Sequence, residues 1–558
     1  MSLPLASTPS IAAASAVHRL WPVVLIAAAM VVGLYNLGGS GPMWPDDSRY
    51  ANAAAMIHDW IKSDQWLAPY EFAKQNYAQY PEFSLPFHPP GYPGVMGMWF
   101  VLTGPSYESA RVFVAGCYGL AACLIFAIAR RLGASGIAAM LGSLLFLSMP
   151  ETARWARSTM SEIPALTAFL AATYCFVRWA QGGKWAWCVA AFALAQFAFF
   201  CRVTTTGLMP TWALFLLFRK DFRRLFSPGL IALGVVYLAI NFVWVKYVGQ
   251  FASHEVLGPG ENRADVFSPE NLTFYLNLIP DMVGWVTVVL AILGVIWLAI
   301  ERETRPIALL WLGWFLGYYC FQVSLGRLEQ RYFNFALPGL AGLAMALVAI
   351  KRFGPVWRRL APVALVAAIA TNAFAVAQIP PGVVGNEALA TRLAQTDQPG
   401  NVLMACWVDQ DLVFRYRSKP HQHDRMMIRS DRTLAIRVSD YAHVEPRPLV
   451  HDDAGVIDVI KKGRVRYVIT ATSSLPDMDD RPHDMLLADR AVRALPDQFK
   501  LLDTFDLAIT WGDSQRRSKL FLWQYLGELP PGASELPVVI PTAGIEYRPD
   551  QPRNETKQ

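Results

Sequence analysis

The sequence predicts a polytopic α-helical membrane protein of about eleven transmembrane helices, followed by a small soluble α/β domain. The 558 residues are 54% hydrophobic and only 16% charged, and the mean hydropathy is +0.29. A soluble protein of this size carries more charge. Long uncharged stretches recur through the first 380 residues, and the composition turns polar after Pro380. The first part of the chain is therefore predicted to lie in a membrane and the last part in water.

Eleven uncharged windows are the candidate spans. A helix needs about 20 apolar residues to cross the hydrocarbon of a bilayer, and such a segment must be helical because its backbone finds no water there. The windows are 20–37, 112–129, 134–149, 163–177, 185–201, 203–218, 225–245, 282–300, 306–325, 332–350 and 360–379. The first window is too long for the apolar part of a signal peptide, so we expect it to be retained.

The basic residues predict the orientation, since Lys and Arg favour cytoplasmic connections. They gather in alternate connections, at 130–131, 178–184, 219–224, 302–305 and 351–359. The other connections are conspicuously acidic. The N-terminus is therefore predicted to lie in the cytoplasm and the segment after the last span outside.

The same patterns predict the domain boundaries. The predicted parts are an N-terminal tail (1–17), a transmembrane domain (18–380) whose first outer loop (40–107) carries interfacial helices, a soluble α/β domain (381–540) and a disordered tail (541–558). Alternating and apolar runs distinguish strands from helices in the soluble part. They predict strands at 401–407, 465–470 and 519–525 and helices at 386–395 and 484–494.

Two adjacent carboxylates, Asp46 and Asp47, follow the first window by a few residues and so lie at the membrane surface. The spacing of Asp47, Tyr50 and Ala54 suits a short helix lying on the membrane. The alternative role for Asp46 is to cap that helix, because Asp is a good N-cap and acids suit a helix N-terminus. A cap needs one carboxylate, however, and this region holds more than one.

Two further side chains are candidates on the same side. Prolines at 89, 90 and 93 stiffen the backbone around His88, whose imidazole could bind an anion or transfer a proton. A solvated turn histidine is the alternative. Glu162 adds a third carboxylate at the mouth of the fourth window, with helix capping before Pro164 as its alternative role.

The remaining outer connections bring cations: Arg202, Arg327 and Arg331. Arg forks suit phosphate oxygens, although these side chains could simply neutralise the acidic loops. Acids and cations at the ends of the spans indicate an outward-facing site at the lipid interface, which suits an amphiphilic substrate that bears phosphate. A transporter would be expected to carry ionisable groups near the midplane, and the eleven windows contain no Asp, Glu, Lys or Arg.

The sequence indicates neither a nucleic-acid partner nor a strong metal site. The net charge of +6 follows from the basic connections, since no basic face is interleaved with stacking aromatics. No Cys/His spacing typical of a metal site occurs. A divalent cation shared by Asp46 and Glu162 stays an alternative.

Four motifs, in this order and on one side of the membrane, resemble the GT-C membrane glycosyltransferases in the branch of protein O-mannosyltransferases and lipid A aminoarabinose transferases. The motifs are Pro-Asp-Asp-Ser-Arg-Tyr at 45–50, His-Pro-Pro-Gly-Tyr at 88–92, Ala-Arg-Ser-Thr-Met-Ser-Glu-Ile-Pro at 156–164 and Glu-Gln-Arg-Tyr at 329–332. The resemblance covers roughly residues 15–380, and rhizobial galacturonosyltransferase-type relatives look most similar around His88.

The resemblance implies an inverting glycosyltransferase in a bacterial inner membrane that moves a sugar from a polyprenyl-phosphate donor to a lipid, glycan or protein acceptor of the cell envelope on the periplasmic face. It also implies a metal-independent reaction. Asp46 takes the place of the family's catalytic Asp, Asp47 that of the following Glu, and Glu162 that of the acid in the second loop. His88 stands where the aminoarabinose transferases carry a phosphate-binding Lys.

In this interpretation Asp46 is the general base, and Arg202 and Arg331, with His88 and Arg327, hold the donor phosphate. Candidate acceptor contacts are Tyr50, His254, Glu255, Glu261 and Arg263. The alternatives are a carrier or flippase for a lipid-linked saccharide, and an outward-facing binding protein for such a lipid.

Overall fold

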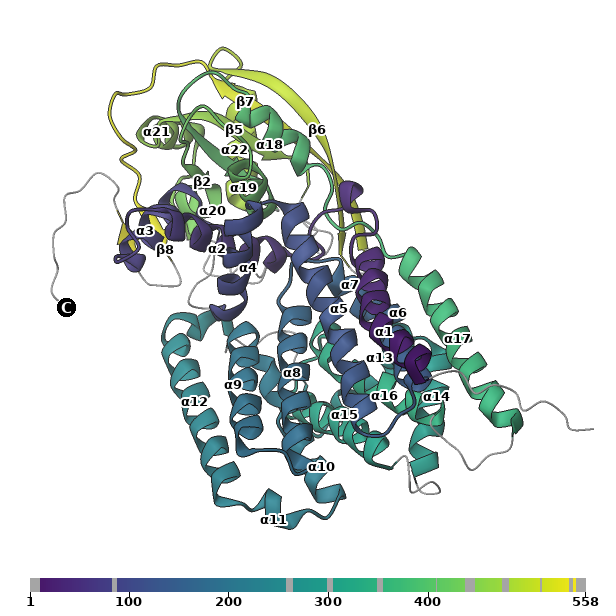
Figure 1. The fold of residues 1–558 in the computed structure, drawn as a ribbon. Helices are drawn as coiled ribbons and strands as arrows, with labels where there is room; N and C mark the ends of the chain where they lie inside the picture. The colour runs from purple at the N-terminus through teal and green to yellow at the C-terminus, as the bar shows by residue number, and fades with distance from the viewer. Residues whose placement is uncertain are drawn as a thin grey trace, which may run out of the picture.

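The computed structural model describes residues 11–82, 88–256, 264–298, 305–348, 355–407, 409–436, 447–473, 481–511, 514–540 and 545–547. A bundle of long helices carries a sheet domain at one end, and helices α2 (Pro45–Lys62), α3 (Pro69–Gln79) and α4 (Gly91–Thr103) lie between the two (Figure 1). The predicted fold class, a polytopic helical protein with a small C-terminal α/β domain, is confirmed.

The bundle forms where the sequence is apolar and uncharged. Its helices are α1 (Ile11–Gly33), α5 (Tyr107–Arg131), α6 (Gly136–Ser148), α7 (Pro150–Ala156), α8 (Glu162–Ala180), α9 (Trp185–Cys201), α10 (Pro210–Phe218), α12 (Pro228–Val256), α13 (Pro269–Val283), α14 (Trp285–Leu298), α15 (Arg305–Leu325), α16 (Leu337–Val348) and α17 (Pro355–Ala377). Shorter pieces connect them, namely η1 (Leu37–Gly39), η2 (Val203–Leu208), α11 (Phe222–Leu225) and η3 (Gln330–Ala336).

The count of eleven spans is not confirmed. Within the described ranges, seven helices are long and apolar enough to cross a membrane, or up to nine if each of two bent pairs is one span. The bent pairs are α6 with α7, at 69°, and α13 with α14, at 117°. The windows 185–201 and 203–218 form shorter apolar helices. Arg202 interrupts the apolar run between them, and the next α-helix, α10, begins only at Pro210.

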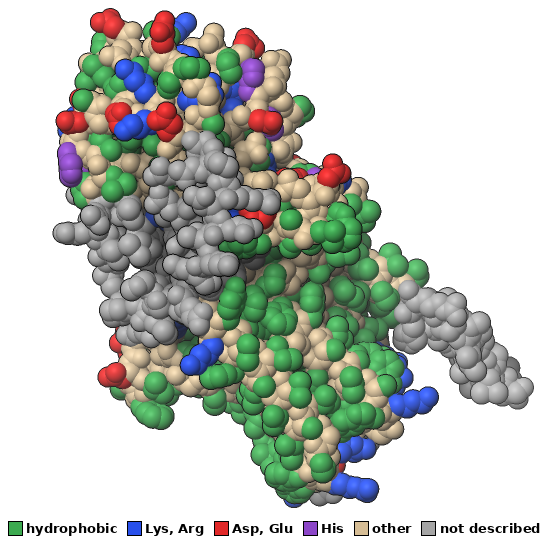
Figure 2. Space-filling model, turned by 90° about the vertical axis from the view of Figure 1, so that its left-hand side faces the viewer, with side chains coloured by type: hydrophobic (Ala, Val, Ile, Leu, Met, Phe, Trp, Pro, Cys, Tyr) green, Lys and Arg blue, Asp and Glu red, His purple; other side chains and the backbone are tan. Residues whose placement is uncertain are grey.

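Apolar side chains cover the outside of the bundle. Figure 2 shows them spread over the helical part below the charged C-terminal domain, with Lys and Arg side chains at the far end. The stretch Gln330–Val348 is 94% buried inside the protein, whereas Pro228–Val248 is only 11% buried. Helix α16 is therefore central, and α12 faces the surroundings of the bundle.

Helix α2 is longer than the short interfacial helix that the sequence predicted, and its cap differs. Trp44 occupies the N-cap position and Pro45 the first helical position, so Asp46 and Asp47 lie in the first turn. Asp46 therefore does not have the alternative role of helix cap: the helix begins at Pro45, two residues before the start that a cap at Asp46 would give. Both acids still lie near the positive end of the helix dipole.

The C-terminal domain is built on a five-stranded sheet with the strand order β2-β1-β5-β7-β6. Its helices and strands are α18 (Asn386–Ala394), β1 (Asn401–Ala405), α19 (Asp409–Arg417), β2 (Met427–Arg429), α20 (Ser430–Thr433), β3 (Ala435–Ile436), β4 (Arg447–Pro448), α21 (Asp453–Lys462), β5 (Val465–Ala471), α22 (His483–Ala494), β6 (Phe499–Trp511), β7 (Ser514–Tyr525), β8 (Val538–Ile540) and β9 (Ile545–Tyr547). Strand β1 pairs in parallel with β2 and β5, and β7 pairs antiparallel with β5 and β6. The three predicted strands and two predicted helices of this domain are confirmed.

Strand β6 was not predicted, because it is an edge strand and carries polar residues among its apolar ones. The predicted tails fall largely outside the described residues. Only 11–17 of the N-terminal tail and 545–547 of the segment 541–558 are described, the latter as β9.

Candidate active site

The carboxylate of Asp46 lies between two arginines. Its Oδ1 is 3.3 Å from Nη1 of Arg49 in the next turn of α2, and its Oδ2 is 3.3 Å from Nη1 of Arg331 in η3. Burial acts against the charge of this carboxyl group. It is outweighed by His88, which is protonated in the acid range where Asp46 titrates, and by the guanidinium groups of Arg331, Arg49 and Arg202, so the pKa of Asp46 lies well below its usual range. Because the arginines keep their charge at physiological pH, Asp46 is an ionised carboxylate.

Asp47 experiences the opposite environment. Its side chain is fully buried, and its Oδ2 accepts a hydrogen bond of 2.6 Å from the backbone N–H of Met43. Burial and the negative charge of Glu162 raise the pKa of Asp47 well above its usual range, despite that hydrogen bond. Thr159 donates to the backbone carbonyl of Asp47 at 2.9 Å, which joins the start of α2 to the connection between α7 and α8.

Arg202 and Glu162 form a buried pair beside α2. Nη2 of Arg202 lies 3.0 Å from Oε1 of Glu162, and its Nη1 donates to the hydroxyl of Tyr50 at 3.1 Å. All three side chains are buried. The structure thus brings together residues from the first outer loop, the start of α8 and the break between α9 and η2.

Arg331 and Arg327 converge on Tyr332. The hydroxyl of Tyr332 accepts hydrogen bonds from Arg327 at 3.0 Å and from Arg331 at 3.1 Å. The guanidinium of Arg202 lies 5.5 Å from the centre of the Tyr332 ring, and that of Arg331 lies 4.9 Å from it. Arg331 also forms an ion pair with Glu329. Three arginines therefore surround one aromatic ring near Asp46.

His88 is buried against Tyr50, and their ring centres are 4.5 Å apart. Burial and the nearby arginines lower the pKa of His88 to about 3, although Asp46 acts in the opposite direction. The imidazole is therefore neutral at physiological pH. It can donate or accept one hydrogen bond per ring nitrogen, but it brings no positive charge to a phosphate.

Three members of this cluster were not among the predicted site residues: Arg49, Tyr332 and Trp44. Arg49 binds Asp46 directly, and the guanidinium of Arg331 lies 4.9 Å from the centre of the Trp44 ring. The signal was present in the sequence, because Arg49 and Tyr332 belong to the motifs at 45–50 and 329–332.

The structure describes the side chains of only some of the predicted acceptor-binding residues. Tyr50 lies in the cluster. His254 and Glu255 fall in the last turn of α12, where only the backbone is described, and Glu261 and Arg263 lie outside the described residues. Within the part of the chain that the structure describes, no group of three or more His, Cys, Asp or Glu side chains could hold a metal ion.

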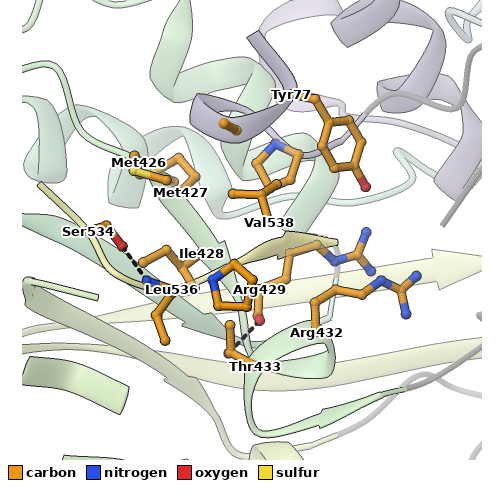
Figure 3. A pocket seen from close by; sticks show the side chains of 13 residues that line it. Tyr77, Met426, Met427, Ile428, Arg429, Arg432, Thr433, Ser534, Leu536 and Val538 are labelled. Carbon is orange, nitrogen blue, oxygen red and sulfur yellow. Dashed lines mark hydrogen bonds between the residues drawn. The ribbon is translucent and has the colours of Figure 1, made fainter. Parts of the chain in front are cut away.

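A separate pocket lies between the first outer loop and the C-terminal domain (Figure 3). It encloses about 420 Å³ of empty space, including its open mouth, and Tyr77 of α3 faces Ile428, Arg429 and Val538 across it. None of the described residues that line it was predicted to belong to the site. Its walls are mainly apolar, which distinguishes it from the charged cluster around Asp46.

Comparisons with known proteins agree with this architecture. Residues 87–247 match the model of the dolichyl-phosphate-mannose-protein mannosyltransferase family. The fold is similar to that of ArnT from Cupriavidus metallidurans, with a TM-score of 0.56 and 16% identity for its apo structure, over 91% of this chain and 98% of ArnT. The structure of the same protein bound to undecaprenyl phosphate matches with a TM-score of 0.55 and 16% identity, over 90% of this chain and 98% of ArnT. No curated protein sequence is significantly similar to this chain.

The family match covers the segment that carries His88, Glu162 and Arg202, and the shared fold covers nearly the whole chain. The segment 87–247 is thus similar to this mannosyltransferase family, and the chain shares the fold of ArnT.

Proposed function

We propose that this protein is an inverting glycosyltransferase that moves a sugar from a polyprenyl-phosphate donor to a lipid, glycan or protein acceptor on the periplasmic face of a bacterial inner membrane. The observation that carries the proposal is the ionised Asp46 carboxylate next to Arg331, with Arg202 and Arg327 grouped around the same tyrosine, Tyr332. A base and a group of phosphate-binding cations are the two elements that such a transfer needs.

A hollow on the outside of the bundle supports the proposal that the donor carries a lipid chain. Between α9 and α12 it is lined by apolar and aromatic side chains, namely Phe200, Ala239, Ile240, Val243, Trp244 and Tyr247. Phe200 lies two residues before Arg202, so the hollow ends close to the cationic cluster. A chain of isoprene units on this surface would place its phosphate near Arg202. One of the similar ArnT structures is bound to undecaprenyl phosphate, which is a lipid of this kind.

The reaction is a single displacement. A lone pair of the acceptor oxygen attacks the anomeric carbon, the bond from that carbon to the phosphate oxygen breaks, and the configuration inverts. Asp46 takes the proton of the acceptor hydroxyl, a contribution of roughly 10²- to 10⁴-fold. Arg202 and Arg331 stabilise the charge that grows on the leaving polyprenyl phosphate. Since that phosphate competes with Asp46 for Arg331, donor binding makes the carboxylate a stronger base.

We propose that no divalent cation takes part, because arginines already occupy the carboxylates that could hold one. Glu162 pairs with Arg202, and Asp46 pairs with Arg331 and Arg49. Transfer is then expected to persist in EDTA. Loss of transfer in EDTA and its recovery with Mg²⁺ or Mn²⁺ would favour a cation between Asp46 and Glu162.

The decisive experiment compares wild type with Asp46→Asn in proteoliposomes that contain a panel of undecaprenyl-phosphate-linked sugars and an envelope extract as acceptor. Mass spectrometry follows the glycosylated product and the released undecaprenyl phosphate. Asp46→Asn is expected to insert and fold normally but to lose at least about 10²-fold in transfer. Asp64→Asn, an exposed acid in the same loop, is the control and should keep full activity.

The outcomes separate the alternatives. Transbilayer movement of the lipid-linked saccharide without any glycosylated product would identify a carrier or flippase. Binding of the lipid without turnover would identify a binding protein. Normal transfer by Asp46→Asn would remove Asp46 from the mechanism.

A further inference from the structure

The C-terminal domain contacts helix α2 on the side opposite Asp46. We infer that α19, together with the linker at 381–383, holds α2 in its active position, and that Arg417 and Asn52 are the positioning residues of this contact. The inference rests on the proposed function, since it assigns to the C-terminal domain the task of orienting the candidate base. It concerns how Asp46 is held rather than what Asp46 does.

Arg417, at the end of α19, forms the first contact. Its Nη2 lies 2.6 Å from Oδ2 of Asp59 near the end of α2, and its Nη1 donates to the backbone carbonyl of Asn52 at 3.2 Å. The guanidinium also lies 4.6 Å from the centre of the Tyr80 ring. The Arg417 side chain is only 2% exposed, so this ion pair is shielded from water on its arginine side.

Asn52 forms the second contact. Its Nδ2 donates to the carbonyl of Ser48 in α2 and to the carbonyl of Gln410 in α19, both at 3.0 Å. Asn52 is fully buried and Gln410 is 6% exposed. One side-chain amide thus joins the first turn of α19 to the turn of α2 that follows Asp46.

The geometry of the helix explains why these contacts do not block the site. At about 100° per residue, Ser48, Asn52 and Asp59 project within roughly 40° of one another, whereas Asp46 projects about 160° from Ser48. Helix α19 therefore lies along the back of α2, and Asp46 and Tyr50 face Arg331 and Arg202 on the front.

Backbone hydrogen bonds to the linker at 381–383 form a second attachment, at the segment that precedes α2. The N–H of Gly41 donates to the carbonyl of Pro381 at 3.0 Å, and the N–H of Val383 donates to the carbonyl of Pro42 at 3.0 Å. Val384 in turn exchanges two backbone hydrogen bonds with Ala508 of β6, at 2.8 and 2.9 Å. The segment that precedes α2 is therefore paired with the linker, and the linker is paired with the sheet of the C-terminal domain.

Two attachments at separate points determine the direction of a helix, whereas one would let it pivot. A displacement of a catalytic group by about 1 Å can reduce the rate about 10²-fold, so the orientation of α2 matters for Asp46. The groups proposed to hold the donor phosphate lie on other elements, at the end of α9 and in η3. Loosening α2 should therefore reduce turnover more than it reduces donor binding.

Hydrogen exchange of the full-length protein in nanodiscs tests the positioning without any substrate. Arg417→Met and Asn52→Ala are each expected to accelerate amide exchange at residues 45–56 by about tenfold or more. Ala has a higher helix propensity than Asn, so faster exchange in Asn52→Ala cannot come from a weaker intrinsic helix. Arg417→Lys, which keeps the charge toward Asp59, should restore most of the protection.

The matched control is Arg425→Met. Arg425 is a buried arginine of the same domain, and it donates to the backbone carbonyls of Thr396, Gln398 and Gly400, all within that domain. Its loss should accelerate exchange in the C-terminal domain but leave residues 45–56 unchanged. Unchanged exchange at 45–56 in both Arg417→Met and Asn52→Ala would overturn the inference.

Turnover provides the second readout. In Arg417→Met and Asn52→Ala, kcat is expected to fall about 10- to 100-fold, while the affinity for undecaprenyl phosphate stays within about threefold of wild type. A loss of affinity with unchanged kcat would contradict positioning. If wild type itself transfers no sugar, the proposed function fails, and hydrogen exchange still decides whether α19 positions α2.

Discussion

Asp46 and Asp47 are neighbours in the chain, yet their surroundings give them different chemistry. Asp46 faces Arg49 and Arg331 and stays ionised. Asp47 points into the protein, accepts the N–H of Met43, and has a raised pKa because it is buried near Glu162. Neighbouring residues on a helix project about 100° apart, which suffices to separate a candidate base from a structural carboxyl group.

The first prediction concerns that difference. Asp47→Asn keeps an oxygen acceptor for the Met43 N–H, so transfer is expected to stay within about tenfold of wild type, whereas Asp46→Asn loses at least about 10²-fold. Asp47→Leu leaves the buried Met43 N–H without its partner and should lower the free energy of unfolding by about 1–3 kcal/mol. Steady-state kinetics and denaturant unfolding check both. Equal losses in the two Asn variants would contradict the assignment.

The second prediction concerns the pH dependence of stability. Folded His88 has a pKa of about 3, against about 6.5 when unfolded, so unfolding takes up a proton between these values. The contribution of His88 to the free energy of unfolding is therefore fully present above pH 6.5. It falls as the pH decreases toward 3, by up to about 1.4 kcal/mol per pH unit. Thermal unfolding at pH 7.5 and pH 5 should show a loss of about 2 kcal/mol in wild type and a smaller loss in His88→Gln. Identical losses would show that His88 is not the group that titrates.

Helix α2 joins the site to the rest of the molecule through its close approach to the linker. A Cβ atom on Gly41 would lie 1.8 Å from the carbonyl oxygen of Val383, and Gly382 has a φ of +75° with the Pro42 carbonyl close by. Only glycine allows both the contact at position 41 and the backbone conformation at position 382. The two glycines are therefore needed for the attachment that precedes α2.

The third prediction follows from this packing. Gly41→Ala is expected to lower the free energy of unfolding by about 3 kcal/mol, at the upper end of overpacking effects, and to reduce transfer. Gly94→Ala in α4 is the matched control, because a Cβ there meets no atom within 4 Å. It should be neutral or should stabilise the protein by up to about 1 kcal/mol. Thermal unfolding of the two variants side by side measures the difference, and equal stability would contradict the close approach.

At the scale of the whole molecule, the charged C-terminal domain lies at one end, the apolar bundle follows it, and Lys and Arg side chains lie at the far end of the bundle (Figure 2). Helix α11, which contains Arg223 and Arg224, lies at the end of the bundle away from the C-terminal domain (Figure 1). Gln181 donates to the carbonyl of Arg131 at 3.0 Å, so two more of the basic connections meet on one side. This arrangement fits a protein whose basic end faces the cytoplasm.

The fourth prediction tests that orientation in cells. Alkaline phosphatase, which is active only outside the cytoplasm, is expected to be active when fused after residue 558 and inactive when inserted after Leu225 in the α11 connection. Green fluorescent protein at the same two positions should give the reverse pattern. The opposite result with both reporters would place the candidate site on the cytoplasmic face.

Local patterns in the sequence predicted much of the fold. Uncharged windows located the helices of the bundle because burial in lipid requires apolar side chains, and apolar runs located β1, β5 and β7 for the same reason in the sheet. The count of eleven spans is not confirmed, because the windows 185–201 and 203–218 form shorter helices and an apolar run does not reveal a bend such as the one between α13 and α14. The polar edge strand β6 gave too weak a signal.

The sequence by itself determined which residues could form the site, namely acids and arginines at the ends of apolar windows on one side of the membrane. Only the tertiary structure decided which pairs they form, that the pKa of Asp46 is lowered and that of Asp47 raised, that His88 is neutral, and that α19 supports α2 from behind. Pairing, burial and support depend on contacts between residues far apart in the chain, such as Asp46 with Arg331 and Asn52 with Gln410. Such contacts leave no local pattern, because they arise only when the helices pack.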